Sequence, residues 1–132
     1  MAGAIDDRIA SINDGFAKQG DWRANLNHMV ERRLQVYEIV MPYRVAAEAL
    51  KFQSTILLTQ HMKFVREERQ RLLALIPEKL LGDAVLTEGL EAALSFDMWN
   101  QLRNDQRLNA DEAGDVVKRI VSSLLAAHSL NP

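Results

Sequence analysis

Apolar residues recur at intervals of three and four along most of the chain, and this spacing constrains the fold more than any other feature. Residues three and four apart lie on one face of an α-helix, whereas a strand would alternate apolar and polar positions. The 132 residues include only 6 Gly and 3 Pro, so few positions interrupt a helix. The sequence therefore predicts an all-α fold.

Caps and prolines mark the first three of five predicted helices. The first is expected from Ala2 to Lys18 and the second from Asp21 to Leu50, since Asp is a favourable N-cap residue. Pro42 should kink the second helix, because proline lacks an N–H and its ring crowds the preceding turn. The third helix is expected from Phe52 to Ile76 and should end before Pro77.

The last two predicted helices differ in their apolar faces. The fourth, from Asp83 or Thr87 to Asn104, is apolar on two sides and must bury both. The fifth begins at Asn109, and Glu112 three residues later fits a capping box. No linker or repeat is visible, so residues 1–132 are expected to form one domain. The stripe of the fifth helix consists of Ala113, Val116, Val117, Ile120, Val121, Leu124 and Leu125.

Composition and motifs argue against several classes of function. The formal charge is -2, whereas a nucleic-acid-binding domain is usually basic. There are no cysteines, and no histidine follows a glutamate by three residues, as a helical di-iron site requires. Phosphate-binding and dinucleotide-binding glycine patterns are also absent. We expect no catalytic residues, no metal and no cofactor, and a small helical enzyme is the least favoured hypothesis.

The expected compartment is the cytoplasm. No apolar run approaches the ~18 residues that a membrane-spanning helix needs. The N-terminus lacks the basic and apolar segments of a secretory signal. No membrane partner is expected.

The break at Pro42 and the nearby His61 suggest a place for a small ligand. A broken helix inside a bundle frees a carbonyl group and opens space, or it simply bends the helix around the core. His61 lies between Leu57 and Phe64 at helical spacing. It is either a polar anchor in an apolar pocket or a histidine at the edge of the core.

The fourth and fifth helices together suggest a dimer. Two such helices from each of two subunits would form a four-helix interface, and the alternative is that one chain buries all of this surface. The dimer is favoured, because five helices in so short a chain are not expected to enclose every apolar side. The predicted interface residues are Leu86, Leu90, Leu94, Val117, Ile120, Val121 and Leu124.

Ser95–Arg103 contains an aromatic residue and a Trp-x-x-Leu-Arg sequence, and Gln106–Asn109 then predicts a helix break before an acidic helix. With this pattern, Leu90 to Leu125 is the part of the chain that most strongly resembles the C-terminal regulatory domain of TetR-family transcription regulators. The segment Tyr37–Ala47 is similar to the kinked helix before the family's pocket. The resemblance extends from Asp21 to about Leu125.

The resemblance implies a homodimer that senses a small, mostly apolar effector and does no chemistry. The effector would lie between the second, third and fourth helices and would change the spacing of attached DNA-binding domains. No helix-turn-helix segment is recognised here, so operator DNA would be reached only through a missing N-terminal domain. The alternative is a dimerisation or protein-interaction module without a ligand. The implied ligand-binding residues are Tyr37, Met41, Phe52, His61, Met62 and Trp99.

Overall fold

The computed structural model describes residues 21–130, and the helix predicted from Ala2 to Lys18 lies outside this range. All regular structure in the described range is helical, which confirms the all-α prediction. The elements in chain order are α2 (Trp22–Leu50), α3 (Thr55–Leu75), α4 (Glu78–Leu81), α5 (Ala84–Ala93), α6 (Phe96–Asn100), the π-helical segment η1 (Gln101–Asp105) and α7 (Ala110–Leu130).

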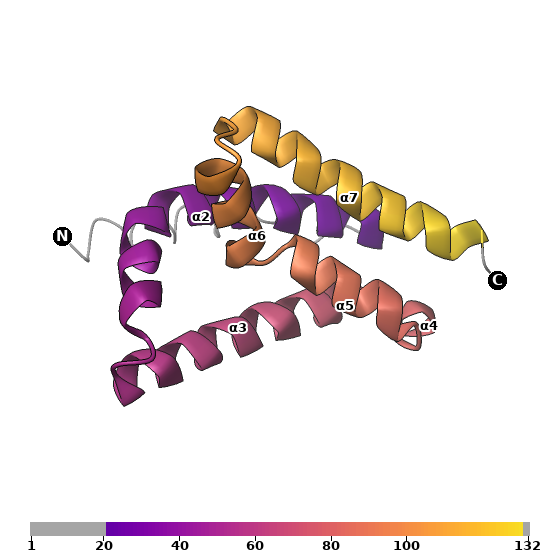
Figure 1. Ribbon diagram of the computed structural model, residues 1–132. Helices are drawn as coiled ribbons and strands as arrows, with labels where there is room; N and C mark the ends of the chain where they lie inside the picture. Colours follow the sequence, from indigo (N-terminus) through magenta and orange to yellow (C-terminus); the bar gives the residue numbers. More distant parts are fainter. Residues whose placement is uncertain (1–20, 131–132) are drawn as a thin grey trace.

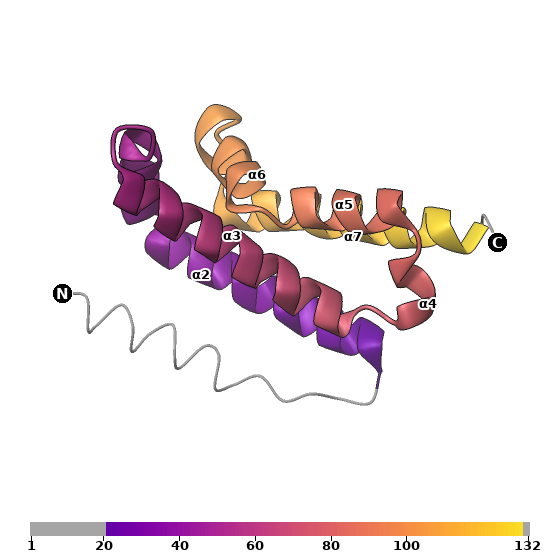
Figure 2. The same cartoon turned by 90° about the horizontal axis from the view of Figure 1, so that it is seen from below.

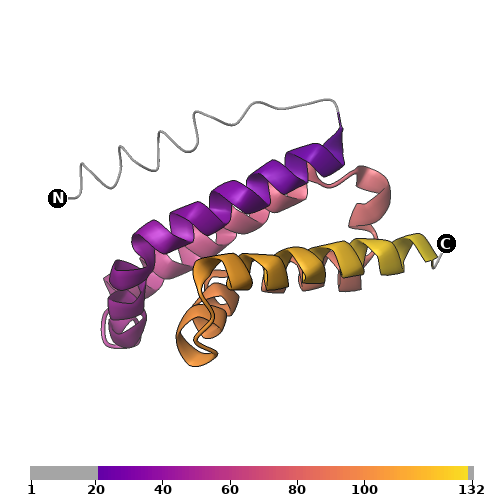
Figure 3. The ribbon, with the colours of Figure 1, turned by 90° about the horizontal axis from the view of Figure 1, so that it is seen from above.

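The longer helices form two pairs. α2 lies beside α3, and α5 lies beside α7 (Figures 2 and 3). The short α6 contacts α2, and η1 contacts α7, so these two segments join the pairs at one end (Figure 1). No helix in residues 21–130 is long and apolar enough to cross a membrane.

The second helix bends but does not break. α2 continues through Pro42 to Leu50, and Figure 1 shows it turning sharply near its C-terminal end, so that its last turns run toward the start of α3. The bend agrees with the predicted effect of an internal proline. Asp21 caps the helix as predicted, because its side chain accepts a hydrogen bond of 3.0 Å from the backbone N–H of Arg23.

The third helix starts slightly later than predicted and ends where predicted. It begins after Ser54, whose hydroxyl accepts a hydrogen bond from the N–H of Leu57 at 3.3 Å. Phe52 therefore lies in the turn that precedes α3. At the other end Ile76 is extended, with φ -83° and ψ 130°, as the steric demand of the following Pro77 requires.

The prediction of one fourth helix up to Asn104 is wrong. Asp83, one of the two predicted starts, caps α5, but this helix ends at Ala93. Ser95 then accepts a hydrogen bond of 3.1 Å from the N–H of Met98 and starts α6. A serine side chain that caps a new helix competes with continuation of the old one, so the chain changes direction here.

The fifth predicted helix begins with the expected capping box. The side chain of Asn109 accepts a hydrogen bond of 2.8 Å from the N–H of Glu112, and Glu112 accepts one of 3.1 Å from the N–H of Asn109.

The core beneath this helix contains side chains from α2, α3, α5, α6 and α7. Its largest fully buried members are Trp99, Tyr37, Leu26, Met29, Leu72, Leu90, Leu94 and Val117.

Candidate functional site

A hollow of about 230 Å³ lies between the bent end of α2 and the first turns of α3. The residues from each helix are spaced by one, three or four positions, so each set occupies one helix face. This is the region where the sequence predicted a ligand site, beside Pro42 and His61. The hollow is lined by Val40, Arg44, Ala47, Glu48 and Lys51 from the α2 side and by Leu57, Gln60, His61 and Phe64 from α3.

Three basic side chains of the hollow surround one carboxylate. Among the described lining residues Glu48 is the single acid. Lys51 Nζ lies 2.7 Å from its Oε2, while His61 Nδ1 and Arg44 Nη2 lie 3.2 and 3.9 Å from its Oε1. The hollow therefore carries more positive than negative charge.

Arg44 is held mainly by aromatic rings. Its guanidinium carbon lies 4.0 Å from the ring centre of Phe64 and 4.7 Å from that of Phe96, both within the range of a cation–π contact. Within the described part of the chain, the buried Nη1 of Arg44 has no hydrogen-bond partner. The rings thus orient Arg44, while its capacity to donate hydrogen bonds is only partly used.

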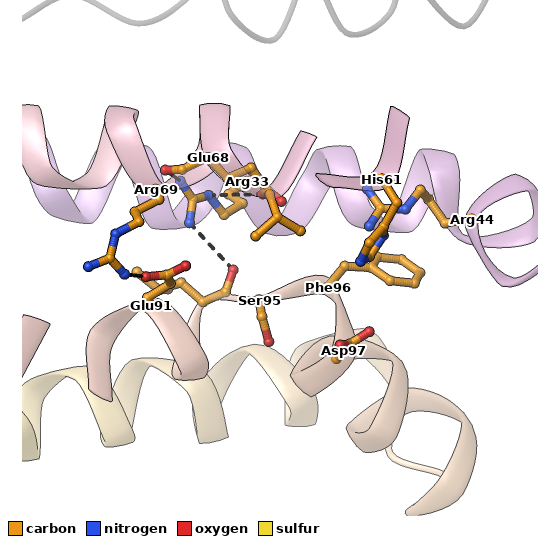
Figure 4. Close-up of a pocket in the computed structure, with 11 residues that line it drawn as sticks. Arg33, Arg44, His61, Glu68, Arg69, Glu91, Ser95, Phe96 and Asp97 are labelled. Atoms are coloured by element: carbon orange, nitrogen blue, oxygen red, sulfur yellow. Dashed lines mark hydrogen bonds and ion pairs between the residues drawn. The ribbon is translucent and has the colours of Figure 1, made fainter. Parts of the chain in front are cut away.

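A smaller cavity of about 40 Å³ adjoins the hollow, between α3 and the junction of α5 with α6. Arg44 and His61 line both spaces. Figure 4 shows these two residues beside Phe96 at one end of the cavity, with Arg33 and Glu68 toward the other end. The two spaces therefore share a wall made of charged side chains.

Arg33, Tyr37 and Glu68 form a buried polar cluster at the far end of this cavity. Arg33 donates a hydrogen bond of 2.9 Å to the carbonyl oxygen of Glu68, and its Nη1 lies 3.5 Å from the carbonyl oxygen of Leu94. The hydroxyl of Tyr37 lies 2.8 Å from the same Leu94 oxygen and also contacts the Glu68 carboxyl group. The cluster thereby connects α2 and α3 to the α5–α6 junction.

The Glu68 carboxyl group lies between the Tyr37 hydroxyl and Arg33, whose Nε is 3.5 Å from Oε2 of Glu68. Tyr37 has one hydroxyl proton, yet its oxygen lies against both the Glu68 carboxyl group and the Leu94 carbonyl oxygen. The one hydroxyl proton can be donated to only one of these two acceptors at a time. Burial raises the pKa of Glu68, against the opposing effect of Arg33, and burial followed by the Glu68 charge raises the pKa of Tyr37.

The structure brings one of the six predicted ligand residues, His61, into the hollow. Tyr37 is fully buried in the polar cluster, and Met41 packs against the core. Trp99 is buried, and its indole N–H donates a hydrogen bond of 2.8 Å to Glu38. Phe52 and Met62 are 82% and 57% exposed. These five residues do not line the hollow at the bend of α2.

The remaining lining residues were missed, although part of the signal was present. The α3 residues follow the spacing of Leu57, Gln60, His61 and Phe64, which is one helix face and can be read from the sequence. The α2 face that includes Arg44 is equally regular. Periodicity could not show that these two faces lie opposite each other, because that depends on how α2 bends.

Five of the seven predicted interface residues are buried within a single chain. α5 packs against α7, and this contact encloses the apolar sides that were expected to require a second subunit. Ile120 and Leu124 are partly buried against the same core. In this arrangement the five are not available to a partner. They are Leu86, Leu90, Leu94, Val117 and Val121, each at most 4% exposed.

In residues 21–130 no group of three or more His, Cys, Asp or Glu side chains is placed to hold a metal ion. Comparisons with protein-family models, with curated proteins and with solved structures find no match to this chain.

Proposed function

We propose that this chain is the effector-binding and dimerisation domain of a TetR-type transcription regulator. The observation that carries the proposal is the hollow of about 230 Å³ at the bend of α2, beside His61. A mostly apolar hollow with a few polar groups is the usual form of a small-molecule site. The resemblance of Ser95–Arg103 to the family adds a second, independent support.

The proposed mechanism is a population shift between two helix arrangements. A ligand that binds better to one separation of α2 and α3 favours that arrangement. Arg33 and Tyr37 contact Leu94, so a shift of α2 would reach the α5–α6 junction. α5 packs on α7, and these helices would transmit the change to the partner subunit and to a helix-turn-helix domain outside these 132 residues.

The ligand site can be tested by filling the hollow. Ala47 lines the hollow, whereas the adjacent Ala46 is exposed, so Ala47→Trp and Ala46→Trp form a matched pair. A screen of small molecules by thermal shift should find compounds that raise the Tm of the wild type and of Ala46→Trp but not of Ala47→Trp. The proposal is wrong if no compound distinguishes the two variants.

The dimer can be tested on the exposed side of α5. Val85 is 81% exposed there, and Val45 on α2 is 41% exposed. If the interface includes the outer face of α5, Val85→Glu should lower the mass measured by light scattering to that of a monomer, and Val45→Glu should leave it unchanged. A wild-type chain that is monomeric at all concentrations would contradict the proposed dimerisation.

A second candidate function is a protein-interaction module without a ligand. Large apolar side chains are exposed around the turn between α2 and α3, and contiguous exposed apolar surface is typical of contact sites. This candidate predicts that Ile56→Asp abolishes association while Ala47→Trp has no effect. The exposed residues are Tyr43, Leu50, Phe52, Ile56 and Met62.

A further inference from the structure

The hollow at the bend of α2 has an excess of basic groups, and this excess bears on the kind of ligand it selects. Arg44, Lys51 and His61 all approach the carboxylate of Glu48. Within the lining of the hollow, Arg44 and Lys51 carry two full positive charges and Glu48 carries one negative charge, so the lining has a net positive charge. A ligand with a negative charge is attracted to such a site, and a positively charged ligand is repelled.

The hydrogen bonds around Glu48 are incomplete. Arg44 reaches this carboxylate only at 3.9 Å, which is a charge contact and too long for a hydrogen bond. The buried Nη1 of Arg44 has no hydrogen-bond partner within the described residues. A buried donor without an acceptor is costly, and a guanidinium with unused donor capacity forms strong hydrogen bonds with an acid group that its nitrogens reach.

Arg44 cannot easily turn away from the hollow to find another acceptor. Its guanidinium lies against the rings of Phe64 and Phe96 at 4.0 and 4.7 Å. A guanidinium that is already oriented loses little conformational freedom when it binds an acid group. This favours recognition of a planar carboxylate, which accepts two parallel hydrogen bonds from arginine.

Part of the lining of the hollow is apolar. Val40, Ala47, Leu57 and Phe64 form this part, and we refer to these four residues as the apolar wall. Hydrocarbon placed against the apolar wall is removed from water, which favours a ligand with an apolar body. The volume of about 230 Å³ limits the ligand to a small molecule.

We infer that the hollow selects an amphipathic organic acid, with its carboxylate beside Arg44 and Lys51 and its hydrocarbon body against the apolar wall. This inference rests on the proposed function and adds the chemical class of the effector. The carboxylate of the ligand shares the basic groups with Glu48 and accepts a hydrogen bond from Arg44. A neutral ligand of the same shape contacts the apolar wall but pairs neither with the positive charge of the lining nor with the N–H donors of Arg44.

The test compares ligands that share one hydrocarbon body and differ in charge. The probes are 4-phenylbutyrate, its primary amide and 4-phenylbutylamine, and octanoate with its amide and amine. Binding to the full chain is measured by saturation-transfer NMR and by calorimetry. We expect each acid to bind at least about tenfold tighter than its amide, the size of one hydrogen bond to a charged group, and the amines to bind weakest.

Two variants assign the preference to the basic groups. Arg44→Gln should lower the affinity for each acid to that for its amide and leave the affinity for the amides unchanged. Because Arg44 also packs between two rings, Lys51→Gln at the end of α2 provides a second variant. It should reduce the ratio of acid affinity to amide affinity without disturbing the stacking of Arg44. Lys63→Gln, an exposed lysine of α3 outside the hollow, should leave the ratio unchanged.

The outcomes separate this inference from the proposed function. If amides or amines bind as tightly as the acids and Ala47→Trp abolishes their binding, the hollow is a ligand site but the inference is overturned. If no member of either series binds the wild type, the inference and the proposed ligand site both fail. An acid preference that survives both basic-group variants also overturns the inference.

Discussion

Arg103 on η1 forms an ion pair with Glu38 on α2 and donates hydrogen bonds to it through two guanidinium nitrogens. Nη2 lies 2.9 Å from Oε1 of Glu38, and Nε lies 3.1 Å from both carboxylate oxygens. Trp99, four residues earlier, donates its indole N–H to the same carboxylate at 2.8 Å. Residues four apart share a helix face, so the Trp-x-x-Leu-Arg pattern places both donors toward one acid. Nη1 of Arg103 also donates to the carbonyl oxygen of Leu108, just before α7.

Arg103→Lys should destabilise the fold, because an ammonium group cannot replace the fork of hydrogen bonds to Glu38 and Leu108. We expect a loss of about 1 kcal/mol in the free energy of unfolding, at the low end for charged hydrogen bonds because both side chains remain partly exposed. Urea denaturation measures this loss in the free energy of unfolding. Arg66→Lys at an exposed position of α3 is the control, and equal effects of the two variants would contradict the structural role of Arg103.

Glu38 should stabilise the fold more at neutral than at acidic pH. Burial tends to raise its pKa, but the hydrogen bonds from Arg103 and Trp99 hold the pKa below its ordinary value of 4.5. A folded-state pKa below the unfolded one gives stability that is present above the unfolded pKa and lost as the pH falls through the folded pKa. Glu38→Gln should therefore cost more stability near pH 7 than near about pH 3. A cost that does not change with pH would refute this ion pair.

Glu68 should show the opposite dependence on pH. Burial raises its folded-state pKa above the ordinary value of 4.5 despite the charge of Arg33. The stability that this group contributes is present below the unfolded pKa and is lost as the pH rises through the folded pKa. Relative to the wild type, Glu68→Gln should gain stability as the pH is raised from about 4 to 8. Denaturation at several pH values measures the difference, and a relative loss with rising pH would show that Glu68 is ionised in the fold.

Substitution of Arg107 by glycine should stabilise the fold. It is the one described residue other than glycine with a positive φ, at 58°. A side chain costs roughly 1–2 kcal/mol in this left-handed region, and glycine avoids the clash. Arg107→Gly should raise the free energy of unfolding by about 1 kcal/mol. Gln106→Gly, at a residue with φ -92° and ψ -7°, should lower stability instead. A lower Tm for Arg107→Gly would mean that its side chain makes compensating contacts.

The helix caps were the part of the fold most open to prediction. Asp21 and the pair Asn109–Glu112 cap helices where the sequence places them, and Asp83 caps the helix at one of its two predicted starts. A cap is a contact within three or four residues, so its signal is local. Ser95 is equally local but was overlooked, because the apolar pattern continues across it and suggested one uninterrupted helix.

The site was predictable only in its neighbourhood. Pro42 and His61 indicated the end of the α2–α3 pair where the hollow lies, but Arg44 and Glu48 were not identified. Phe52 and Met62 are exposed, since an apolar residue on a helix does not reveal whether another element covers it. Likewise Leu90 and Val117 are buried against helices of their own chain, which periodicity cannot distinguish from burial in a dimer.

The sequence by itself determined that the described part of the chain is helical, where α2 and α7 begin, where α3 ends, and which helix bends. These features depend on backbone sterics, caps and the spacing of apolar residues over one or two turns. Only the tertiary structure decided that Glu38 meets Trp99 and Arg103, that Arg44 lies between two phenylalanine rings, and that α5 buries its apolar side against α7. These contacts join residues up to 65 positions apart, and such pairings follow from how whole helices pack, which no local pattern encodes.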